Sequence, residues 1–182
     1  WETLRRQPWR LVSFARRMAE LHVALHAVAA PADFPDQRGR FQRRIQQEGA
    51  LPQDTRQQLL DLLERLPAED RICHGDFHPG NILITAQDEV IIDWIDVTRG
   101  SPLADLARTS IIALGAAATQ QVPQAWMKVI LRLFHALYLR RYFQLRPGGY
   151  EEYRHWLPVV AAARLAENMP ELEAWLVSQA TK

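Results

Sequence analysis

The sequence has only one cysteine, Cys73, in 182 residues, so a fold held together by internal disulfides is excluded. No apolar run approaches the roughly 18 residues that a membrane-spanning helix needs, and no membrane partner is expected. No secretory signal pattern opens the sequence. Together with the single cysteine, this favours a reducing, cytoplasmic location.

An excess of one charge sign is also absent. The 22 Lys and Arg residues nearly balance the 21 Asp and Glu residues, which leaves a formal charge of +1. A chain this close to neutral has no general attraction to nucleic acid or to an anionic membrane, so no nucleic-acid partner is expected. Its hydrophobic content of 48% is ordinary for a globular protein, and a chain of this length most simply forms one domain.

Helical periodicity covers most of the chain. Between Arg10 and Ala30 apolar residues recur at steps of three and four, which predicts an amphipathic helix. Further helices are predicted over residues 38–47, 54–66, 102–117, 123–145, 149–166 and 170–179. Segment 123–145 is apolar on most faces and is expected to be central. Short strands are predicted over residues 71–73, 82–85 and 90–92. The predicted fold class is mainly α (α+β), a helical bundle with one short β-hairpin.

The most informative motif is the run His74-Gly75-Asp76-Phe77-His78-Pro79-Gly80-Asn81, followed by Ile91-Ile92-Asp93. If the hairpin turns about Gln87, residues whose numbers sum to 174 lie opposite each other, and Asn81 faces Asp93 with Cα atoms roughly 5 Å apart. One amide and one carboxylate are a sufficient protein share for Mg²⁺, which keeps waters and substrate phosphates as its other oxygen ligands. Asp76 then lies where it can accept or orient the proton of an attacking hydroxyl.

These residues resemble the aminoglycoside phosphotransferase family, small-molecule kinases with a protein-kinase-like fold. The resemblance rests on His74-Gly75-Asp76 with Asn81, Ile92-Asp93-Trp94, Gly100, Pro102 and Asp105-Leu106-Ala107, and more loosely on the helix with Leu21–His26. It implies that Asp76 is the catalytic base and that Asn81 and Asp93 bind magnesium. It also implies that His74 is a structural member of the catalytic loop and that Asp105 is a buried carboxylate bracing that loop through backbone N–H groups. The implied reaction moves the γ-phosphoryl of ATP or GTP to a hydroxyl of a small molecule.

Complete members of that family carry an N-terminal lobe with a phosphate-covering loop and a strand lysine. Residues 1–70 contain only two glycines, Gly39 and Gly49, and no lysine. We therefore expect residues 1–182 to be the C-terminal, catalytic-loop lobe, with the nucleotide-binding lobe of the same protein lying outside this chain. Residues 1–182 alone are expected to show little or no activity.

Other interpretations of the motif remain open. The acceptor could be choline, ethanolamine, homoserine, methylthioribose, a sugar or a macrolide, and a pseudokinase-like domain that binds nucleotide without catalysis is the competing class. His74, Asp76 and His78 also have the composition of a metal-hydrolase cluster, but that interpretation leaves Asn81 and Asp93 unexplained. Within the kinase interpretation, His78 orders the loop or approaches the transferred phosphate.

The remaining polar residues have plainer interpretations. His22 and His26 have a spacing that can bind zinc, but Val23-Ala24-Leu25 lacks the glutamate of a zinc protease, so core packing or hydrogen bonding is favoured. Cys73 is expected to be a small buried hydrophobe. Trp94 could cover the site or pack in the core, and Asp96, close to Asp93, could belong to the site or be a solvated loop carboxylate. Two charged groups are expected to be solvated helix surface, although the acidic one could also face a cationic substrate: Arg38, Arg40, Arg43 and Arg44, and Glu151, Glu152, Glu167, Glu171 and Glu173.

Overall fold

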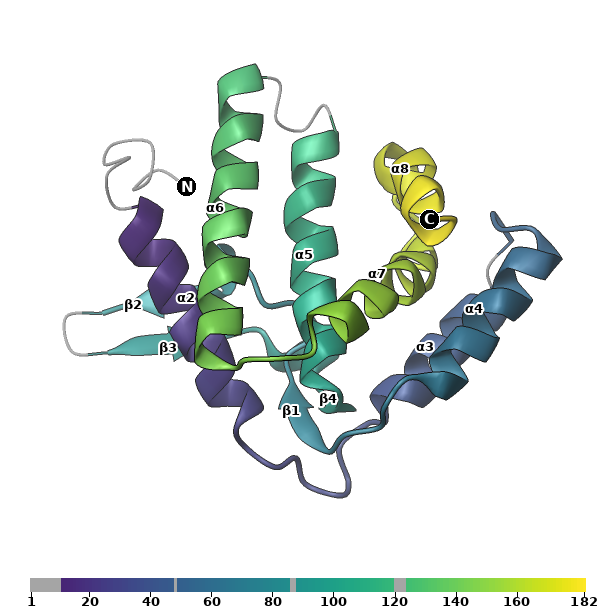
Figure 1. The fold of residues 1–182 in the computed structure, drawn as a ribbon, viewed down its shortest axis with the longest axis horizontal. Helices are drawn as coiled ribbons and strands as arrows, with labels where there is room; N and C mark the ends of the chain where they lie inside the picture. The colour runs from purple at the N-terminus through teal and green to yellow at the C-terminus, as the bar shows by residue number, and fades with distance from the viewer. Residues whose placement is uncertain (1–10, 48, 86–87, 120–123) are drawn as a thin grey trace.

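The fold is a helical assembly with four short strands in the middle of the chain (Figure 1). It is seen in a computed structural model that describes residues 11–47, 49–85, 88–119 and 124–182. Helices α2 (Leu11–His26), α3 (Gln37–Gln47) and α4 (Gln53–Arg65) precede strands β1 (Arg71–Cys73), β2 (Ile82–Ile84), β3 (Glu89–Ile91) and β4 (Thr98–Gly100). Two short 3₁₀ turns, η2 (Pro79–Asn81) and η3 (Trp94–Asp96), lie between the strands. Helices α5 (Pro102–Ala118), α6 (Ala125–Leu145), α7 (Tyr150–Leu165) and α8 (Pro170–Ala180) follow. The predicted mainly α class with short antiparallel strands is confirmed.

The helix bounds agree with the predicted ranges to within a few residues, except at the end of the first helix. Helix α2 ends at His26, although the periodicity continues to Ala30. The segment after it runs beside β1, where Ile72 N donates to Val28 O and Ala30 N donates to Asp70 O. The predicted helix bounds at positions 10 and 123 lie outside the described residues. No helix in the described part of the chain is long and apolar enough to cross a membrane.

Helix α5 is the axis of the assembly. It starts at Pro102, whose fixed φ suits the first helical turn, and every residue from Pro102 to Ile111 is buried. It packs against α6, α7 and α8, and in Figure 1 it stands beside α6. A helix buried over ten successive residues must provide partners for its polar side chains. Asp105, Arg108 and Thr109 each have a hydrogen-bond partner in the loop of residues 74–81, which connects β1 to β2.

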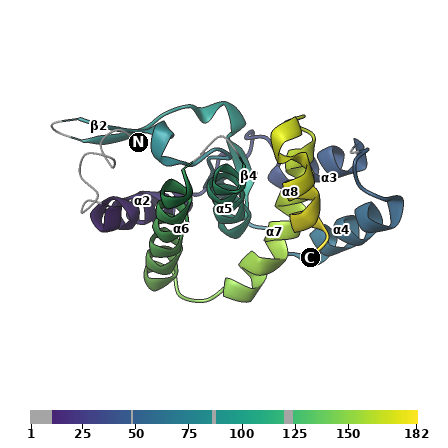
Figure 2. The same ribbon diagram turned by 90° about the horizontal axis from the view of Figure 1, so that it is seen from above.

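Helix α6 is not central, so the prediction for residues 123–145 is wrong. One face packs against α2 and α5, and Figure 2 shows the helix on the side of the molecule away from the β2–β3 hairpin. Its buried residues lie on that one face: Leu131, Phe134, His135, Tyr138 and Tyr142. Large apolar side chains on the rest of the helix are exposed, among them Trp126, Val129 and Leu133. A helix that is apolar all round is expected to be enclosed, but here only one face has helices packed on it.

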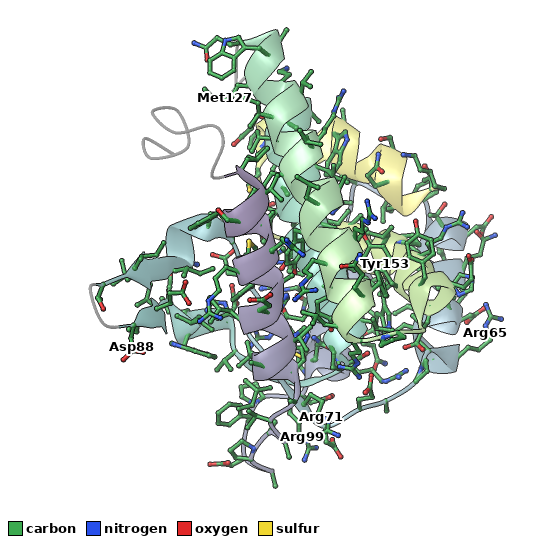
Figure 3. All side chains as sticks on the ribbon, turned by 60° about the vertical axis from the view of Figure 1, so that its left-hand side comes forward. Arg65, Arg71, Asp88, Arg99, Met127 and Tyr153 are labelled. Carbon is green, nitrogen blue, oxygen red and sulfur yellow. The ribbon has the colours of Figure 1, made fainter. Side chains whose placement is uncertain are left out.

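The four strands form two separate antiparallel sheets, one more than predicted. Strands β2 and β3 form the expected hairpin, which carries Asp88 at its outer end in Figure 3. Strand β4 was not predicted; it pairs with β1, so that Arg71 faces Gly100 and Cys73 faces Thr98. Figure 3 shows Arg71 and Arg99 together in this second sheet. Strand β4 has the sequence Thr98-Arg99-Gly100 and lacks the apolar residues that indicated the other three short strands.

The register of the hairpin differs by one residue from the predicted one. Ile82 faces Ile91, so the numbers of paired residues sum to 173 and not to 174. The cause lies at the turn, where Thr85 N donates to Asp88 O (2.8 Å) and Asp88 N donates to Thr85 Oγ1 (2.8 Å). Because Thr85 and Asp88 are bonded to each other, two residues, 86 and 87, lie between them, and both are outside the described residues. The predicted turn is instead centred on Gln87. The prediction that Asn81 faces Asp93 is therefore wrong.

Candidate functional site

The candidate site is the loop that connects β1 to β2, residues 74–81, together with the end of β3. Its entry is a sharp bend at Gly75, which has a φ of 81°. A Cβ atom at this position would lie 2.5 Å from the backbone oxygen of Asp96. Both the left-handed backbone and the close approach of the Asp96 segment require glycine here. The bend places the following residue, Asp76, half-buried at the edge of the molecule.

Asn81 and Asp76 are hydrogen-bonded across the loop. The Nδ2 atom of Asn81 donates to the backbone oxygen of Asp76 (2.9 Å) and to its Oδ2 atom (3.1 Å). Asn81 is buried as the last residue of η2. Because both of these bonds use the amide nitrogen, the Oδ1 atom of Asn81 remains available as an oxygen ligand.

His78 lies between these two residues and acts on both ends of the loop. Its Nδ1 atom accepts a hydrogen bond from Gly80 N (3.0 Å), which caps η2. Its Nε2 atom lies 3.4 Å from Oδ2 of Asp76. The His78 ring is the main cause that lowers the pKa of Asp76 below its usual value, and the charge of Arg108 and the amide of Asn81 act in the same direction. Asp76 is therefore ionised at neutral pH.

His74 connects the loop to the end of β3. Its Nε2 atom lies 3.0 Å from the backbone oxygen of Ile92, to which it can only donate, and its Nδ1 atom accepts from Asp76 N (3.2 Å). The side chain is fully buried, and its ring packs against that of Trp94 at 4.8 Å between centroids. One imidazole thus holds the backbone of Asp76 and that of the residue before Asp93.

Asp93 follows the ladder in a left-handed conformation, with φ 64° and ψ 63°. Asn81 O accepts from Ile92 N (3.0 Å), so Asp93 lies one position beyond the residue that pairs with Asn81. Aspartate tolerates this conformation better than most residues, at some cost. The side chain is exposed, and within the described residues its carboxylate has no hydrogen-bond or ion-pair partner. The two oxygen donors at this end of the hairpin, Asn81 Oδ1 and the Asp93 carboxylate, are of the kind that Mg²⁺ takes.

Asp105 of α5 accepts hydrogen bonds from the backbone at the start of the loop. Its Oδ2 atom accepts from His74 N (2.7 Å) and its Oδ1 atom accepts from Gly75 N (2.8 Å). Two further donors, His22 Nε2 (3.0 Å) and His26 Nε2 (3.1 Å), also reach Oδ2. Burial alone would raise the pKa of Asp105, but the hydrogen bonds from the two histidines outweigh it and hold the pKa well below its usual value. The buried group is therefore an anion with four donors.

His22 and His26 are neutral members of this buried network, in agreement with the expectation of hydrogen bonding. Because each Nε2 donates to a carboxylate, each Nδ1 must accept, and the donors are the hydroxyls of Tyr138 (2.5 Å) and Tyr142 (2.7 Å). Burial lowers the pKa of His22 to about 3 and also lowers that of His26. The ligand-capable atoms of His22, His26 and Asp105 lie within 4.8 Å of one another, as a metal site requires. Their hydrogen bonds, however, already account for every ring nitrogen.

Two residues of α5 that the sequence analysis did not single out also contact the loop. Arg108 Nε donates to Gly75 O (2.9 Å), and Thr109 Oγ1 donates to Phe77 O (2.9 Å). They lie three and four positions after Asp105, on the same face of the helix. The spacing i, i+3, i+4 from Asp105 could have identified both residues in the sequence, because side chains at these positions lie on the same face of a helix and can contact the same loop.

The arginines of α3 are not simply solvated, so that prediction is wrong for three of the four. Arg38 donates to the backbone oxygens of Leu63 and Leu66 at the end of α4. Arg40 donates to the backbone oxygen (2.9 Å) and to Oδ1 (3.1 Å) of Asp96, which fixes the segment that crosses Gly75. Arg44 reaches Glu167 (3.3 Å), and only Arg43 is exposed as predicted.

Two of the glutamates singled out in the sequence, Glu167 and Glu151, form ion pairs with arginines. Glu167 forms ion pairs with Arg44 (3.3 Å), Arg108 (2.5 Å) and Arg164 (3.3 Å). In the first turn of α7, Glu151 pairs with Arg154 (3.3 Å). Burial lowers the pKa of Arg164 to about 10, which still leaves it charged at neutral pH. The surroundings of the loop on this side are therefore cationic, and Glu167 is not free to receive a cationic substrate.

Cys73 and Trp94 make contacts within the protein that support its structure. Cys73 is fully buried, and burial raises the pKa of its thiol, as expected for a small hydrophobe. Trp94 Nε1 donates to Ile91 O (3.0 Å), and its ring covers His74. The metal-hydrolase interpretation of His74, Asp76 and His78 is not favoured, because both ring nitrogens of His74 are hydrogen-bonded within the loop and hairpin.

Comparison with known proteins places these residues in a family context. A family model described as the phosphotransferase enzyme family matches residues 2–156. The matched range includes the loop, the β2–β3 hairpin, the histidines of α2 and the whole of α5. No curated protein matches the chain.

Proposed function

The chain belongs to the phosphotransferase enzyme family, and from this premise we propose that it carries the catalytic centre for transfer of the γ-phosphoryl group of ATP or GTP to a hydroxyl of a small molecule. The observation that supports this most is the hydrogen bond between Asn81 Nδ2 and Asp76 Oδ2 (3.1 Å). It fixes a carboxylate beside an amide whose oxygen is free. Phosphoryl transfer demands mainly positioning and charge neutralisation, which these two groups can provide.

Asp76 is the proposed base. Its lowered pKa keeps it ionised at neutral pH, so it can orient the acceptor hydroxyl and receive its proton. The acceptor oxygen forms a bond to the γ-phosphorus while the bond from that phosphorus to the β–γ bridging oxygen breaks, and the nucleoside diphosphate leaves. The modest basicity of such a carboxylate suits a reaction in which the proton leaves late.

Asn81 and Asp93 are the proposed metal ligands. Asn81 Oδ1 and the exposed Asp93 carboxylate are hard oxygen donors at the same end of the hairpin, which fits Mg²⁺ and does not fit a thiophilic metal. When bound, Mg²⁺ would neutralise charge on the nucleotide phosphates. The protein supplies the rigidity: His74 holds the Ile92 carbonyl next to Asp93, and Asp105 holds His74.

We propose further that the fold corresponds to the C-terminal lobe of a protein-kinase-like enzyme. The support is the order of parts: a helix bearing His26, a loop with Asp76 and Asn81, a hairpin ending at Asp93, and a buried helix whose Asp105 holds the loop. The nucleotide phosphates then also need a covering loop and a lysine outside residues 1–70. We expect little or no ATP turnover from residues 1–182 alone, and measurable turnover by this chain would contradict that expectation.

Replacement of the base in the full-length protein tests the proposed function. Asp76→Ala should lower kcat by several orders of magnitude, roughly 10²–10⁴-fold, while nucleotide affinity survives. The matched control is Asp88→Ala, because Asp88 is an exposed aspartate at the far end of the hairpin, and it should leave kcat unchanged. Normal turnover of Asp76→Ala would refute the assignment. Binding of Mg·ATP by the unmodified full-length protein without turnover on any hydroxyl acceptor would favour the competing, non-catalytic nucleotide-binding domain.

A further inference from the structure

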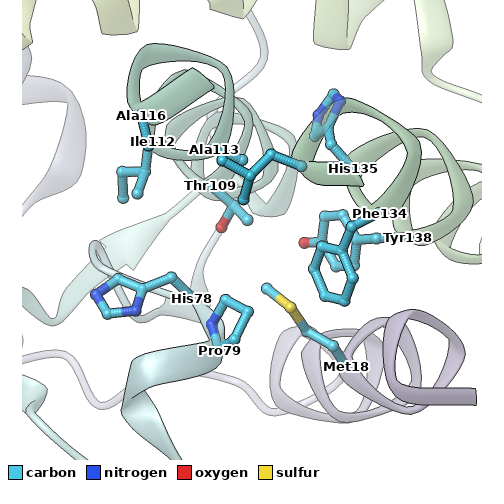
Figure 4. A pocket seen from close by; sticks show the side chains of 11 residues that line it. Met18, His78, Pro79, Thr109, Ile112, Ala113, Ala116, Phe134, His135 and Tyr138 are labelled. Atoms are coloured by element: carbon cyan, nitrogen blue, oxygen red, sulfur yellow. The ribbon is translucent and has the colours of Figure 1, made fainter. Parts of the chain in front are cut away.

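A cavity of about 210 Å³ lies between helices α2, α5 and α6 and the loop of residues 74–81 (Figure 4). Its walls are mostly hydrocarbon: Met18 projects from α2, Ile112 and Ala113 from α5, and Phe134 from α6. For comparison, an apolar protein cavity of roughly 150 Å³ holds a benzene molecule. The cavity can therefore hold a hydrophobic group somewhat larger than one aromatic ring.

The cavity adjoins the proposed base. His78 and Pro79 form its wall on the loop side, as Figure 4 shows. The same His78 has its Nε2 atom 3.4 Å from Oδ2 of Asp76. A molecule seated between α5 and α6 and extending past His78 would thus end at the carboxylate of Asp76.

Three polar side chains in the cavity wall, Thr109, His135 and Tyr138, already have a hydrogen-bond partner within the protein. Thr109 Oγ1 donates to Phe77 O (2.9 Å), and His135 Nε2 lies 2.9 Å from Ser110 Oγ. The hydroxyl of Tyr138 is bonded to His22 (2.5 Å). Burial lowers the pKa of His135 to about 4, so this ring is uncharged at neutral pH. These three groups therefore do not call for a polar or charged ligand.

Carboxylates that could receive a polycationic substrate are missing from this cavity. None of its described lining residues is acidic. On the other side of the loop, Glu167 is paired with Arg44, Arg108 and Arg164. A ligand with several ammonium groups would lose hydration in the cavity and gain no opposite charge there.

We infer that this cavity binds the apolar body of the phosphoryl acceptor, and that the acceptor is an uncharged alcohol with an alkyl or aryl portion of about six to ten carbons. This inference rests on the proposed function, because it identifies the cavity's ligand as the acceptor whose hydroxyl meets Asp76. It disfavours two classes of acceptor, sugars with several amino groups and quaternary amines.

Binding of simple alcohols to the 182-residue chain tests the inference without any catalysis. The probes are the 1-alkanols from butanol to decanol and 4-phenyl-1-butanol, measured by isothermal titration calorimetry. Affinity should rise about three- to fourfold with each added methylene group until the cavity is full. Ala113→Phe, which fills the cavity from α5, should weaken binding of 1-octanol at least tenfold. Ala118→Phe is the matched control, because Ala118 is exposed on the same helix, and it should leave binding unchanged.

Failure of this inference can be told apart from failure of the proposed function. Asp76→Ala should lower turnover of the full-length protein roughly 10²–10⁴-fold and yet keep 1-octanol binding within about threefold, since the carboxylate is outside the apolar wall. If 1-octanol does not bind, or binds equally well to Ala113→Phe, the cavity assignment is wrong whatever the turnover shows. It is equally wrong if kanamycin is phosphorylated efficiently by the full-length protein and Ala113→Phe leaves its KM unchanged.

Discussion

His78 Nε2 lies 3.4 Å from Asp76 Oδ2, and the same ring accepts the N–H of Gly80 through Nδ1. The second bond holds the ring in place, so the first contact is a fixed part of the loop. Through it, His78 stabilises the ionised form of Asp76 more than any other group does.

Replacing His78 should move the acid limb of the activity profile. Because His78 lowers the pKa of Asp76, His78→Gln lets that pKa rise, and activity is then lost at a higher pH as the solution is acidified. The measurement is kcat of the full-length enzyme between pH 3 and 8. His155→Gln, at an exposed histidine of α7, is the control. An acid limb that does not move in His78→Gln would contradict the role given to His78.

Removing either proposed metal ligand should increase the magnesium requirement. In Asp93→Ala and in Asn81→Ala we expect the Mg²⁺ concentration for half-maximal activity to rise at least about tenfold. Asn81→Ala should also lower kcat at saturating Mg²⁺, because Asp76 loses two hydrogen bonds from the amide. The comparison variant is Asp33→Ala, at an exposed aspartate before α3. Unchanged magnesium dependence in Asp93→Ala would exclude Asp93 as a ligand.

Substitution of Gly75 should destabilise the whole chain. Gly75→Ala places a Cβ atom 2.5 Å from the backbone oxygen of Asp96 on a residue with φ 81°. We expect the free energy of unfolding to fall by about 2 kcal/mol or more, measured by urea denaturation. At Gly49 an added Cβ meets nothing within 4 Å, so Gly49→Ala should change stability little. Equal stability of the two variants would show that the bend is not constrained as described.

The buried histidines should make the fold sensitive to mild acid. Burial holds the pKa of His22 at about 3 and that of His135 at about 4, against 6.5 for an unperturbed imidazole. Below about pH 6.5 these imidazoles take up protons in the unfolded chain but not in the folded chain, so the free energy of unfolding decreases as the pH falls. The expected loss is up to about 1.4 kcal/mol per pH unit for each such histidine.

The measurement is the free energy of unfolding in urea at pH 7 and at pH 5. His135→Gln removes one of the contributing rings and should reduce the pH slope between these values. Asp105 does not contribute to this slope, because its pKa is held well below the usual 3.8 and the carboxyl is ionised in the folded and the unfolded chain at both pH values. Equal stability at pH 7 and pH 5 would contradict the buried, neutral state of these rings.

Most helices could be predicted because their signal is local. Apolar spacing and the prolines at positions 67 and 102 mark them without knowledge of tertiary contacts. Strand β4 and the hairpin register could not be predicted in the same way. The first depends on β1, which lies about 27 residues earlier in the chain, and the second depends on two hydrogen bonds between Thr85 and Asp88. The exposure of α6 depends on which other helices pack on it.

The site likewise combines local contacts, which the sequence indicates, with contacts between residues far apart in the chain, which it does not. The spacing from Asp76 to Asn81 is short, and the structure places the two side chains in contact. By contrast, the partners of Asp105 on α2 lie about 80 residues away in sequence, and the acid that holds Arg44 lies 123 residues away. Such contacts leave no periodicity or spacing in the sequence, so the sequence alone favours a solvated surface for the arginines of α3.

The position of Asp105 also determines how the site can form during folding. Its four donors come from residues 30 to 83 positions away, on α2 and on the loop of residues 74–81. An anion buried before all of them arrive would carry a heavy desolvation penalty, so partly assembled versions of the network are unstable. The loop that bears Asp76 therefore gains its order together with the packing of α2 on α5. Exchange of the His74 and Gly75 amide hydrogens with solvent should accordingly require opening of the whole core rather than a local fluctuation of the loop.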